Sequence, residues 1–287
     1  MRGWRKTFCR LDWAGVWWPV YGSHPGRTIV DSLFLGKCAT HRAMATLLRS
    51  ALLSAFGFAH GFALRSTVDS GSPSASADRE ADPGAVLCQV DPQAVGPYVL
   101  RQVHGRRVVT VGQEHTLPSQ QPPEADGLSA GLGRAGLVIR TADCLPLVLA
   151  DPRGRAVAAV HAGWRGLVAG VVDEALHRMQ TSHGVAPAGL IAVVFPHIRG
   201  CCFEIGADVA EPLRVISREA VWKRPGKLRP HGRLEVAVRK QLLAAGVPKD
   251  AIDTVPGCTV CDASRFYSYR RDGRGAGRHL TVVVSGG

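Results

Sequence analysis

Apolar and polar positions alternate regularly from residue 97 onward, and this pattern predicts a series of short strands. The segments YVLRQVHG (98–105) and RRVVTV (106–111) predict a strand that ends at His104, followed by its continuation or hairpin partner. The run GLVIRTADCLPLVLAD (136–151) is apolar on both sides of a polar TADC. It predicts two strand segments joined by a kink, because Pro146 has no backbone N–H to donate to a neighbouring strand. A DPRG turn and the strand RAVAAVHAG (155–163) then return the chain.

A helix is predicted after the GWRG segment (163–166), because apolar residues recur there at helical spacing. These residues are Leu167, Val168, Val171, Val172, Ala175, Leu176 and Met179, and the helix is expected to end near Gly184. The start of this helix would direct free backbone N–H groups and Arg165 to the place where His161 presents its ring. Such a terminus predicts an anion site for a phosphate or a carboxylate.

The first 43 residues differ from the rest of the chain, since they hold four of the six tryptophans without a strand or helix period. We expect residues 1–43 to be an atypical, poorly ordered N-terminal extension from a start codon assigned too early, and residues 44–287 to form a single domain.

The Ser-, Asp-, Gly- and Pro-rich segment 66–84 predicts a flexible surface loop. The run 51–64 predicts a helical turn and a strand, although a start at Met44 would make it resemble a signal peptide.

Composition limits the class of protein. A hydrophobic content of 46% over 287 residues suffices for a large core. No apolar run approaches the roughly 20 residues of a membrane span. Eight dispersed cysteines favour reduced thiols in the cytoplasm over a secreted disulfide framework. The net charge of +12 includes +6 from residues 1–70, with nine basic against three acidic side chains, and the remainder is scattered. We therefore expect no nucleic-acid partner and no membrane partner.

Three segments carry the candidate chemistry. QVHG (102–105), TADCLP (141–146) and AVHAGWRG (159–166) offer one thiol, Cys144, and two imidazoles, His104 and His161. This is the ligand set of a zinc site, and three protein ligands would leave the fourth tetrahedral position for water or substrate. Because 40 and 17 residues separate these positions, spacing alone leaves a second explanation open. Cys144 would then be a small core residue, and each histidine would only be hydrogen-bonded.

The remaining motifs have structural explanations. CTVC (258–261) has the C-x-x-C spacing of half a zinc knuckle or of a redox pair, but no second C-x-x-C and no matching histidine pair completes it. We therefore expect it to be mostly structural. Asp126 in EADGL fits a turn residue, and Arg270, Arg271 and Arg278 fit either an exposed hairpin or a substrate clamp.

The order of these motifs resembles the YfiH-like family, also called PgeF or laccase-domain proteins and named polyphenol or multicopper oxidoreductases. The resemblance rests on QVHG, TADCLPLVLAD, AVHAGWRG, PHIRGCCFEIG and the terminal CT…RFYSYRRDG…GR, and covers about residues 50–285. It implies an α+β fold with two packed mixed β-sheets flanked by helices, in α/β/β/α layers. It assigns zinc, with copper as the alternative metal, to His104, Cys144 and His161.

The activity that the resemblance implies is phosphorolysis of adenosine, inosine and methylthioadenosine to the free base and ribose 1-phosphate, with deamination of adenosine. Zinc would lower the pKa of bound water toward about 7, which would serve attack at C6 of adenosine. Phosphate, held by Arg165 and the start of the GWRG helix, would attack C1′ of the ribose. Asp143 would orient a ligand or carry a proton. The expected substrate site also includes Gly163, Trp164, Gly166 and Arg270.

Several positions depart from the family pattern. Phe195 and Arg199 replace the two glycines of a Gly-Pro-x-Ile-Gly stretch, so side chains would obstruct a ligand that approaches the backbone there. Ala276 replaces a threonine before the final Gly-Arg, and DGRGAGR is one residue longer than usual. The Leu-Asn-Leu-Gly and Asn-Arg elements of the family are missing between residues 66 and 95. We expect these changes to affect substrate affinity more than the metal.

Three other classes of function stay open. The first is amide hydrolysis that removes a misincorporated serine from a peptidoglycan precursor, which zinc would also serve. The second is polyphenol oxidation by four coppers, but the eleven histidines form none of the H-x-H pairs typical of such sites. The third is a non-enzymatic module with salt-dependent nucleic-acid binding. We expect a cytoplasmic monomer or homodimer that acts on small purine nucleosides and phosphate.

Overall fold

The structure, a computed structural model, describes residues 44–65, 81–116 and 121–287. The expected N-terminal extension (1–43) and most of the expected flexible loop (66–84) lie outside the described residues, so the proposed domain boundaries stay predictions. The last two residues of that loop belong to helix α2 (Pro83–Val90). Asp82 caps this helix, since its side chain accepts a hydrogen bond from the backbone N–H of Ala85.

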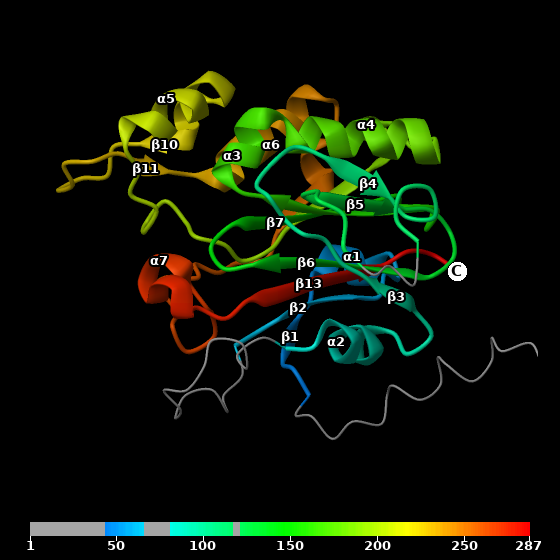
Figure 1. Ribbon diagram of the computed structural model, residues 1–287. Helices are drawn as coiled ribbons and strands as arrows, with labels where there is room; N and C mark the ends of the chain where they lie inside the picture. Colours follow the sequence, from blue (N-terminus) through cyan, green and yellow to red (C-terminus); the bar gives the residue numbers. More distant parts are fainter. Residues whose placement is uncertain (1–43, 66–80, 117–120) are drawn as a thin grey trace, which may run out of the picture. The chain divides into compact units, whose positions relative to one another are not determined.

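Two mixed β-sheets form the centre of the described part of the chain (Figure 1). The first sheet has the spatial order β1 (Leu47–Leu48), β2 (His60–Ala63), β13 (His279–Val284), β6 (Ala135–Thr141) and β3 (Val95–Tyr98). The second has the order β12 (Ile252–Thr254), β9 (Ile191–Val194), β7 (Leu145–Ala150), β8 (Val157–Ala162), β5 (Gly127–Ala130) and β4 (Val108–Thr110). Parallel pairs occur at the edges, between β3 and β6, β12 and β9, and β4 and β5.

Helices cover both outer faces of the pair of sheets (Figure 1). The second sheet is covered by α3 (Trp164–Ala169), α4 (Val171–His183), α5 (Ala207–Ile216) and α6 (Leu234–Ala244). Helix α2 packs on the outer face of the first sheet. Smaller elements are α1 (Ala51–Ala55), α7 (Tyr269–Asp272), the strand pair β10 (Val221–Trp222) and β11 (His231–Gly232), and the 3₁₀ turns η2 (Pro187–Gly189), η3 (Arg218–Ala220), η4 (Lys249–Ala251) and η5 (Gly273–Gly275). The expected α/β/β/α layers are confirmed.

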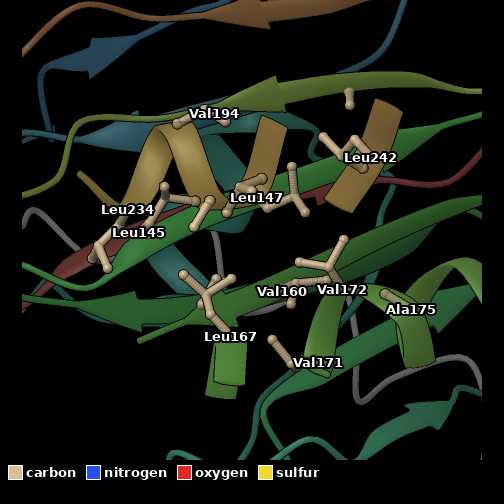
Figure 2. Close-up of a cluster of buried hydrophobic side chains, with 14 of the residues drawn as sticks. Leu145, Leu147, Val160, Leu167, Val171, Val172, Ala175, Val194, Leu234 and Leu242 are labelled. Atoms are coloured by element: carbon tan, nitrogen blue, oxygen red, sulfur yellow. The ribbon is translucent and has the colours of Figure 1, made fainter. Parts of the chain in front are cut away.

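Strict alternation along β7 separates two hydrophobic clusters. Leu145, Leu147 and Leu149 pack toward the helices, whereas Val148 and Ala150 pack between the two sheets. Figure 2 shows the cluster on the helix side. Both faces of this strand are therefore buried, which explains why its sequence is continuously apolar, and each fully buried leucine contributes about 1.5–3 kcal/mol of hydrophobic free energy.

The prediction of a strand ending at His104, with residues 106–111 as its continuation or hairpin partner, is wrong. β3 ends at Tyr98 and β4 begins at Val108, and the two strands belong to different sheets. His104 lies in the loop between them with a φ of +60°, outside any strand. The backbone N–H groups of residues 103–105 donate to the Asp126 carboxylate instead of to a ladder.

The predicted single helix after GWRG is interrupted at Gly170. This glycine has a φ of +91°, which ends α3 and begins α4. Helix α4 ends as expected at Gly184, which has a φ of +68°. The predicted apolar face is buried except for Val168, which is 43% exposed. The two strands on either side of TADC and the DPRG turn before β8 are confirmed.

Among the residues that the structure describes, none of the helices has both the length and the apolar character required to cross a bilayer.

Candidate metal centre

Three side chains from separate segments converge beside the ends of β7 and β8. His104 comes from the β3–β4 loop, Cys144 from the segment before β7, and His161 from β8. Their potential ligand atoms all lie within 4.8 Å of one another, and Cys144 Sγ is 3.8 Å from His104 Nε2. The imidazole centroids are 4.7 Å apart, with the rings inclined by 78°. His161 is buried, Cys144 is partly exposed and His104 is exposed, so the cluster is open to solvent on the His104 side.

The position of Cys144 follows from the crossing of the chain between the two sheets. β6 lies in the first sheet and β7 in the second, and the connection turns at Asp143, which has a φ of +89°. In the ladder that follows, Pro146 pairs with His161. This register places the thiol beside the His161 ring, although 17 residues separate the two in sequence.

Asp126 orients two of the three candidate ligands, a role that sequence analysis missed when it interpreted this residue as part of a turn. Its fully buried carboxylate lies 2.8 Å from His161 Nδ1 through Oδ1. The same group accepts backbone hydrogen bonds from His104 at 2.9 Å and from Gly105 at 2.6 Å. A carboxylate that accepts the N–H of a histidine fixes the ring so that Nε2 is left for a metal.

The ionisation of the cluster reflects its close packing. Burial raises the pKa of the Cys144 thiol, but hydrogen bonds and charge from His104 and His161 outweigh this effect and lower the pKa to about 6. Burial lowers the pKa of His161, whereas Asp126 and Cys144 raise it, with a net rise to about 9. These shifts favour the Cys144 thiolate, which is the form that binds metals, and a bound metal ion would displace the proton that they favour on His161.

Gly163 borders the cluster directly. A Cβ built on this residue would lie 3.1 Å from Cys144 Sγ and 3.1 Å from a carbon of the His104 ring. Gly166 allows the first turn of α3 to approach the His104 loop, since its Cβ would lie 2.9 Å from the Gly105 carbonyl oxygen. Between them, Trp164 is partly buried, and the exposed Arg165 stacks on its ring with the guanidinium carbon 4.4 Å from the centroid.

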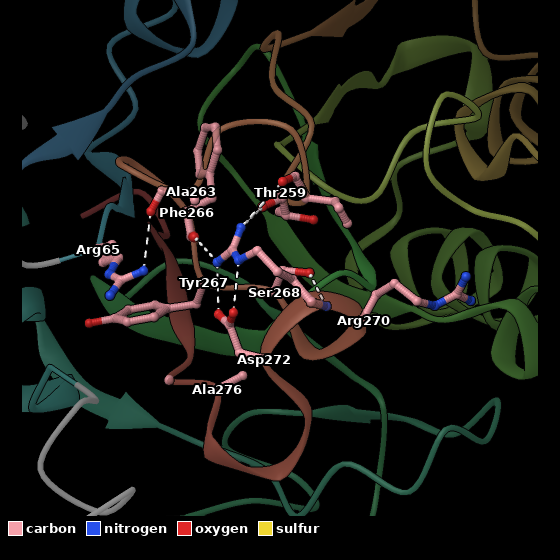
Figure 3. A network of polar contacts seen from close by, with 12 residues as sticks. Arg65, Thr259, Ala263, Phe266, Tyr267, Ser268, Arg270, Asp272 and Ala276 are labelled. Carbon is pink, nitrogen blue, oxygen red and sulfur yellow. Dashed lines mark hydrogen bonds and ion pairs between the residues drawn. The ribbon is translucent and has the colours of Figure 1, made fainter. Parts of the chain in front are cut away.

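The Asp143 carboxylate forms hydrogen bonds with the C-terminal loops. Its carboxylate accepts hydrogen bonds from Thr259 Oγ1 at 2.5 Å, from Ser268 Oγ at 3.1 Å and from the Arg270 backbone N–H at 2.6 Å. Figure 3 shows these three residues in the surrounding polar network. The exposed Arg270 side chain lies over the Phe203 ring, with the guanidinium carbon 5.3 Å from its centroid. Asp143 thus ties the segment next to Cys144 to the C-terminal part of the chain.

The positions that depart from the family pattern point away from the cluster or into the core. Phe195 is fully buried between the sheets and stacks on Phe62 with centroids 6.1 Å apart. Arg199 pairs with Glu235 at 3.1 Å, and Ala276 is buried. The Phe195 side chain is part of the inter-sheet core.

A second group of possible metal ligands consists of Cys201, Cys202, Cys258 and Cys261, whose sulfur atoms all lie within 4.8 Å of one another. In the sequence the C-x-x-C segment lacks the second C-x-x-C or the histidine pair that would complete a zinc site. The structure brings the adjacent cysteines of PHIRGCCFEIG against it instead.

The fold and the His/Cys cluster define a class of two-sheet α+β proteins with a candidate metal centre. The chain belongs to the family described as multi-copper polyphenol oxidoreductase laccase, whose model matches residues 85–286. The crystal structure of YlmD from Geobacillus stearothermophilus superimposes with a TM-score of 0.70 at 25% identity, and the match covers 86% of this chain and 98% of YlmD. That of the Bacillus licheniformis hypothetical protein YfiH gives a TM-score of 0.66 at 23% identity, covering 79% and 92%. The resemblance inferred from the motifs is confirmed.

The names of similar proteins refer to nucleoside chemistry. The purine nucleoside phosphorylase YlmD of Geobacillus stearothermophilus is 32% identical over 190 residues, which are 63% of this chain and 69% of YlmD. A purine nucleoside phosphorylase of Bacteroides thetaiotaomicron is 34% identical over 212 residues, 69% of this chain and 75% of the relative. The adenosine deaminase RL5 of an unknown prokaryotic organism is 34% identical over 191 residues, 64% and 72%. These similarities support a nucleoside-processing enzyme.

Proposed function

We propose that this protein is a zinc-dependent purine nucleoside phosphorylase that converts adenosine, inosine and methylthioadenosine to the free base and ribose 1-phosphate and also deaminates adenosine. The observation that carries the proposal is the convergence of His104, Cys144 and His161 in a cluster open to solvent. The names of the relatives supply the substrate class.

The donor set fits a catalytic zinc site. One thiolate and two imidazoles are ligands that zinc prefers, and three protein ligands leave a position for water or substrate. Asp126 holds His161 in the orientation that a ligand needs. Zinc bound there would supply a Lewis acid that polarises substrate oxygen and makes water nucleophilic near neutral pH. Copper is the alternative metal, because a His₂Cys set also suits it.

We assign roles at this centre to the other predicted residues as well. Gly163 keeps open the space beside Cys144 and His104, where substrate would enter. Because α3 has only six residues, we assign the contact with phosphate to the exposed Arg165 guanidinium rather than to the helix end. Trp164 fixes Arg165 by stacking, and Arg270 supplies a second cation on the loop tied to Asp143. Asp143 has a positioning role, because its hydrogen bonds hold the segment next to Cys144 in place.

The test is a chromatographic assay of purified protein with inosine and adenosine, in the presence and absence of phosphate, together with metal analysis. We expect hypoxanthine and ribose 1-phosphate from inosine only with phosphate, and inosine from adenosine without it. Cys144→Ser should lose both activities and about one equivalent of zinc. His177→Ala is the matched control, because His177 is an exposed histidine on α4, and it should retain both.

Two results would contradict the proposal. Turnover of inosine that does not depend on phosphate would show that the reaction is not phosphorolysis. An unchanged zinc content in Cys144→Ser would show that the metal is not bound at Cys144. Release of serine from a misassembled peptidoglycan precursor, without nucleoside turnover, would favour amide hydrolysis instead.

A further inference from the structure

The four-cysteine cluster joins two loops that are far apart in sequence. Cys201 and Cys202 lie in the turn between β9 and α5, and Cys258 and Cys261 lie in the turn after β12. A parallel bridge pairs His197 with Cys258 and holds the two loops side by side. The backbone positions of the thiols are therefore fixed by strands and bridges that do not involve the sulfur atoms.

The sulfur atoms are close enough to share one ion. Cys201 Sγ lies 3.5 Å from both Cys258 Sγ and Cys261 Sγ, and Cys202 Sγ lies 3.3 Å from Cys261 Sγ. With Zn–S bonds of about 2.3 Å, a tetrahedral site requires S···S separations of about 3.8 Å. Small side-chain rotations would bring the four thiols to this spacing.

We propose that Cys201, Cys202, Cys258 and Cys261 bind a structural zinc ion in a four-thiolate site, independent of the centre at Cys144. Each thiol loses its proton to solvent as its Zn–S bond forms, so no oxidant or reductant is required. Four protein ligands close the coordination sphere, which is typical of structural rather than catalytic zinc. The proposal does not depend on the proposed nucleoside activity.

Four thiolates at this spacing would repel one another strongly. A divalent cation between them would offset that repulsion and replace the four thiol protons.

A disulfide explains the arrangement less well. Cys201 is equally close to two partners, Cys258 and Cys261, and the latter also contacts Cys202. A disulfide joins one pair at about 2.05 Å and separates it from other thiols. Four sulfurs that all lie within 4.8 Å of one another are instead what one tetrahedral ion produces.

A zinc ion here would fix the loop that supports the Cys144 segment. Thr259 lies inside the C-x-x-C turn and donates its hydroxyl to Asp143, the residue before Cys144. Arg271 donates to the carbonyl oxygens of Thr259 and Val260 in the same turn. The role that we assign to the cluster is therefore one of positioning.

Metal stoichiometry of the full chain tests the proposal. The protein is purified under reducing conditions, equilibrated with a weak chelator and analysed by plasma mass spectrometry. We expect one zinc per chain in Cys144→Ser, held by the four-cysteine cluster, and its loss in Cys144→Ser combined with Cys261→Ser. Cys261→His in the same background should restore it, because Cys261 is exposed and imidazole can replace a thiolate.

A second measurement covers the case in which Cys261→Ser fails to fold. Cobalt substituted into folded Cys144→Ser should give the intense sulfur-to-metal charge-transfer absorption of a four-thiolate site. Absence of both zinc and this absorption would overturn the proposal, and so would iron in place of zinc or an intact mass that reveals a disulfide among these cysteines. If Cys144→Ser holds the same single zinc as the unmodified chain, the four-cysteine site stands and the metal assignment at Cys144 fails.

Discussion

His161 and Asp126 are joined twice, through their backbones and through their side chains. The His161 N–H donates to the Asp126 carbonyl oxygen at 2.7 Å, and Nδ1 of the ring lies 2.8 Å from Oδ1 of the carboxylate. The backbone bond fixes where β5 and β8 meet, and the side-chain bond fixes the direction of the ring. Because the same carboxylate also binds the His104 loop, one residue sets the positions of two candidate metal ligands.

Asp126→Asn should weaken the metal centre while keeping the fold. The single amide oxygen can still accept from the His104 N–H and from His161, but it is neutral and a poorer partner. The NH2 group that replaces Oδ2 cannot accept from the Gly105 N–H, so the His104 loop is also held less firmly. Loss of such a carboxylate partner lowers metal affinity about 10- to 100-fold. Zinc affinity is measured by competition with a chromophoric chelator. Asp173→Asn, an exposed change on α4, is the control and should bind zinc as the unmodified protein does. Equal affinities in both variants would show that Asp126 has no part in orienting a ligand.

Gly163→Ala should reduce metal affinity and activity through steric contact. The added methyl group would lie 3.1 Å from Cys144 Sγ and from the His104 ring, so one of the two side chains must move. Such overpacking costs about 1–3 kcal/mol, or roughly 5- to 150-fold in binding. Gly189→Ala is the matched control, since its methyl group would meet only Val185 at 4.0 Å. Metal titration and nucleoside assays on both variants check the prediction, which fails if they behave alike.

The sequence predicts elements well where the signal is local. The β7–β8 hairpin follows from alternation on either side of DPRG, and the buried face of α4 follows from helical spacing. The single predicted helix was wrong at Gly170, since apolar spacing does not reveal a φ of +91°. The strand predicted to end at His104 and to continue into, or pair with, residues 106–111 was wrong, because alternation indicates a strand without indicating the sheet to which it belongs.

The candidate sites depend on contacts that sequence spacing does not encode. Asp126 is 35 residues from His161, and Cys201 is 57 residues from Cys258. Both contacts form only when segments of the second sheet and its loops are placed in register. The family resemblance supplied His104, Cys144 and His161, but a search for fixed spacings missed the pairing of adjacent cysteines with a C-x-x-C turn.

Two adjacent leucines on α6 test which face of this helix supports the fold. Leu242 is fully buried in the helix-side cluster of Figure 2, whereas Leu243 is 39% exposed. Leu242→Ala should lower the free energy of unfolding by about 2–5 kcal/mol, because it leaves a cavity against the sheet. Leu243→Ala should change it by about 0.5 kcal/mol or less. Urea denaturation of both variants gives the comparison, and similar losses would mean that α6 is packed differently.

His279 should make the protein less stable in mild acid. The side chain is fully buried, its Nδ1 donates to the Ala63 carbonyl oxygen at 2.8 Å, and its Nε2 accepts from the Tyr267 N–H at 2.8 Å. Protonation of Nε2 would break the second bond and place a charge in the core. Burial accordingly lowers the pKa from 6.5 to about 4. The unfolded chain thus binds this proton more readily than the folded chain between these two values.

Stability from His279 is therefore present above pH 6.5 and is lost as the pH falls toward 4. Between pH 7 and pH 5 the free energy of unfolding should fall by about 2 kcal/mol from this residue. His60 adds to the fall, because burial lowers its pKa as well. Urea denaturation at both pH values, on the unmodified protein and on His279→Asn, isolates the contribution: the variant is less stable at pH 7 but should lose less between the two. If both proteins lose the same amount, His279 titrates normally in the folded state and is not held neutral by the core.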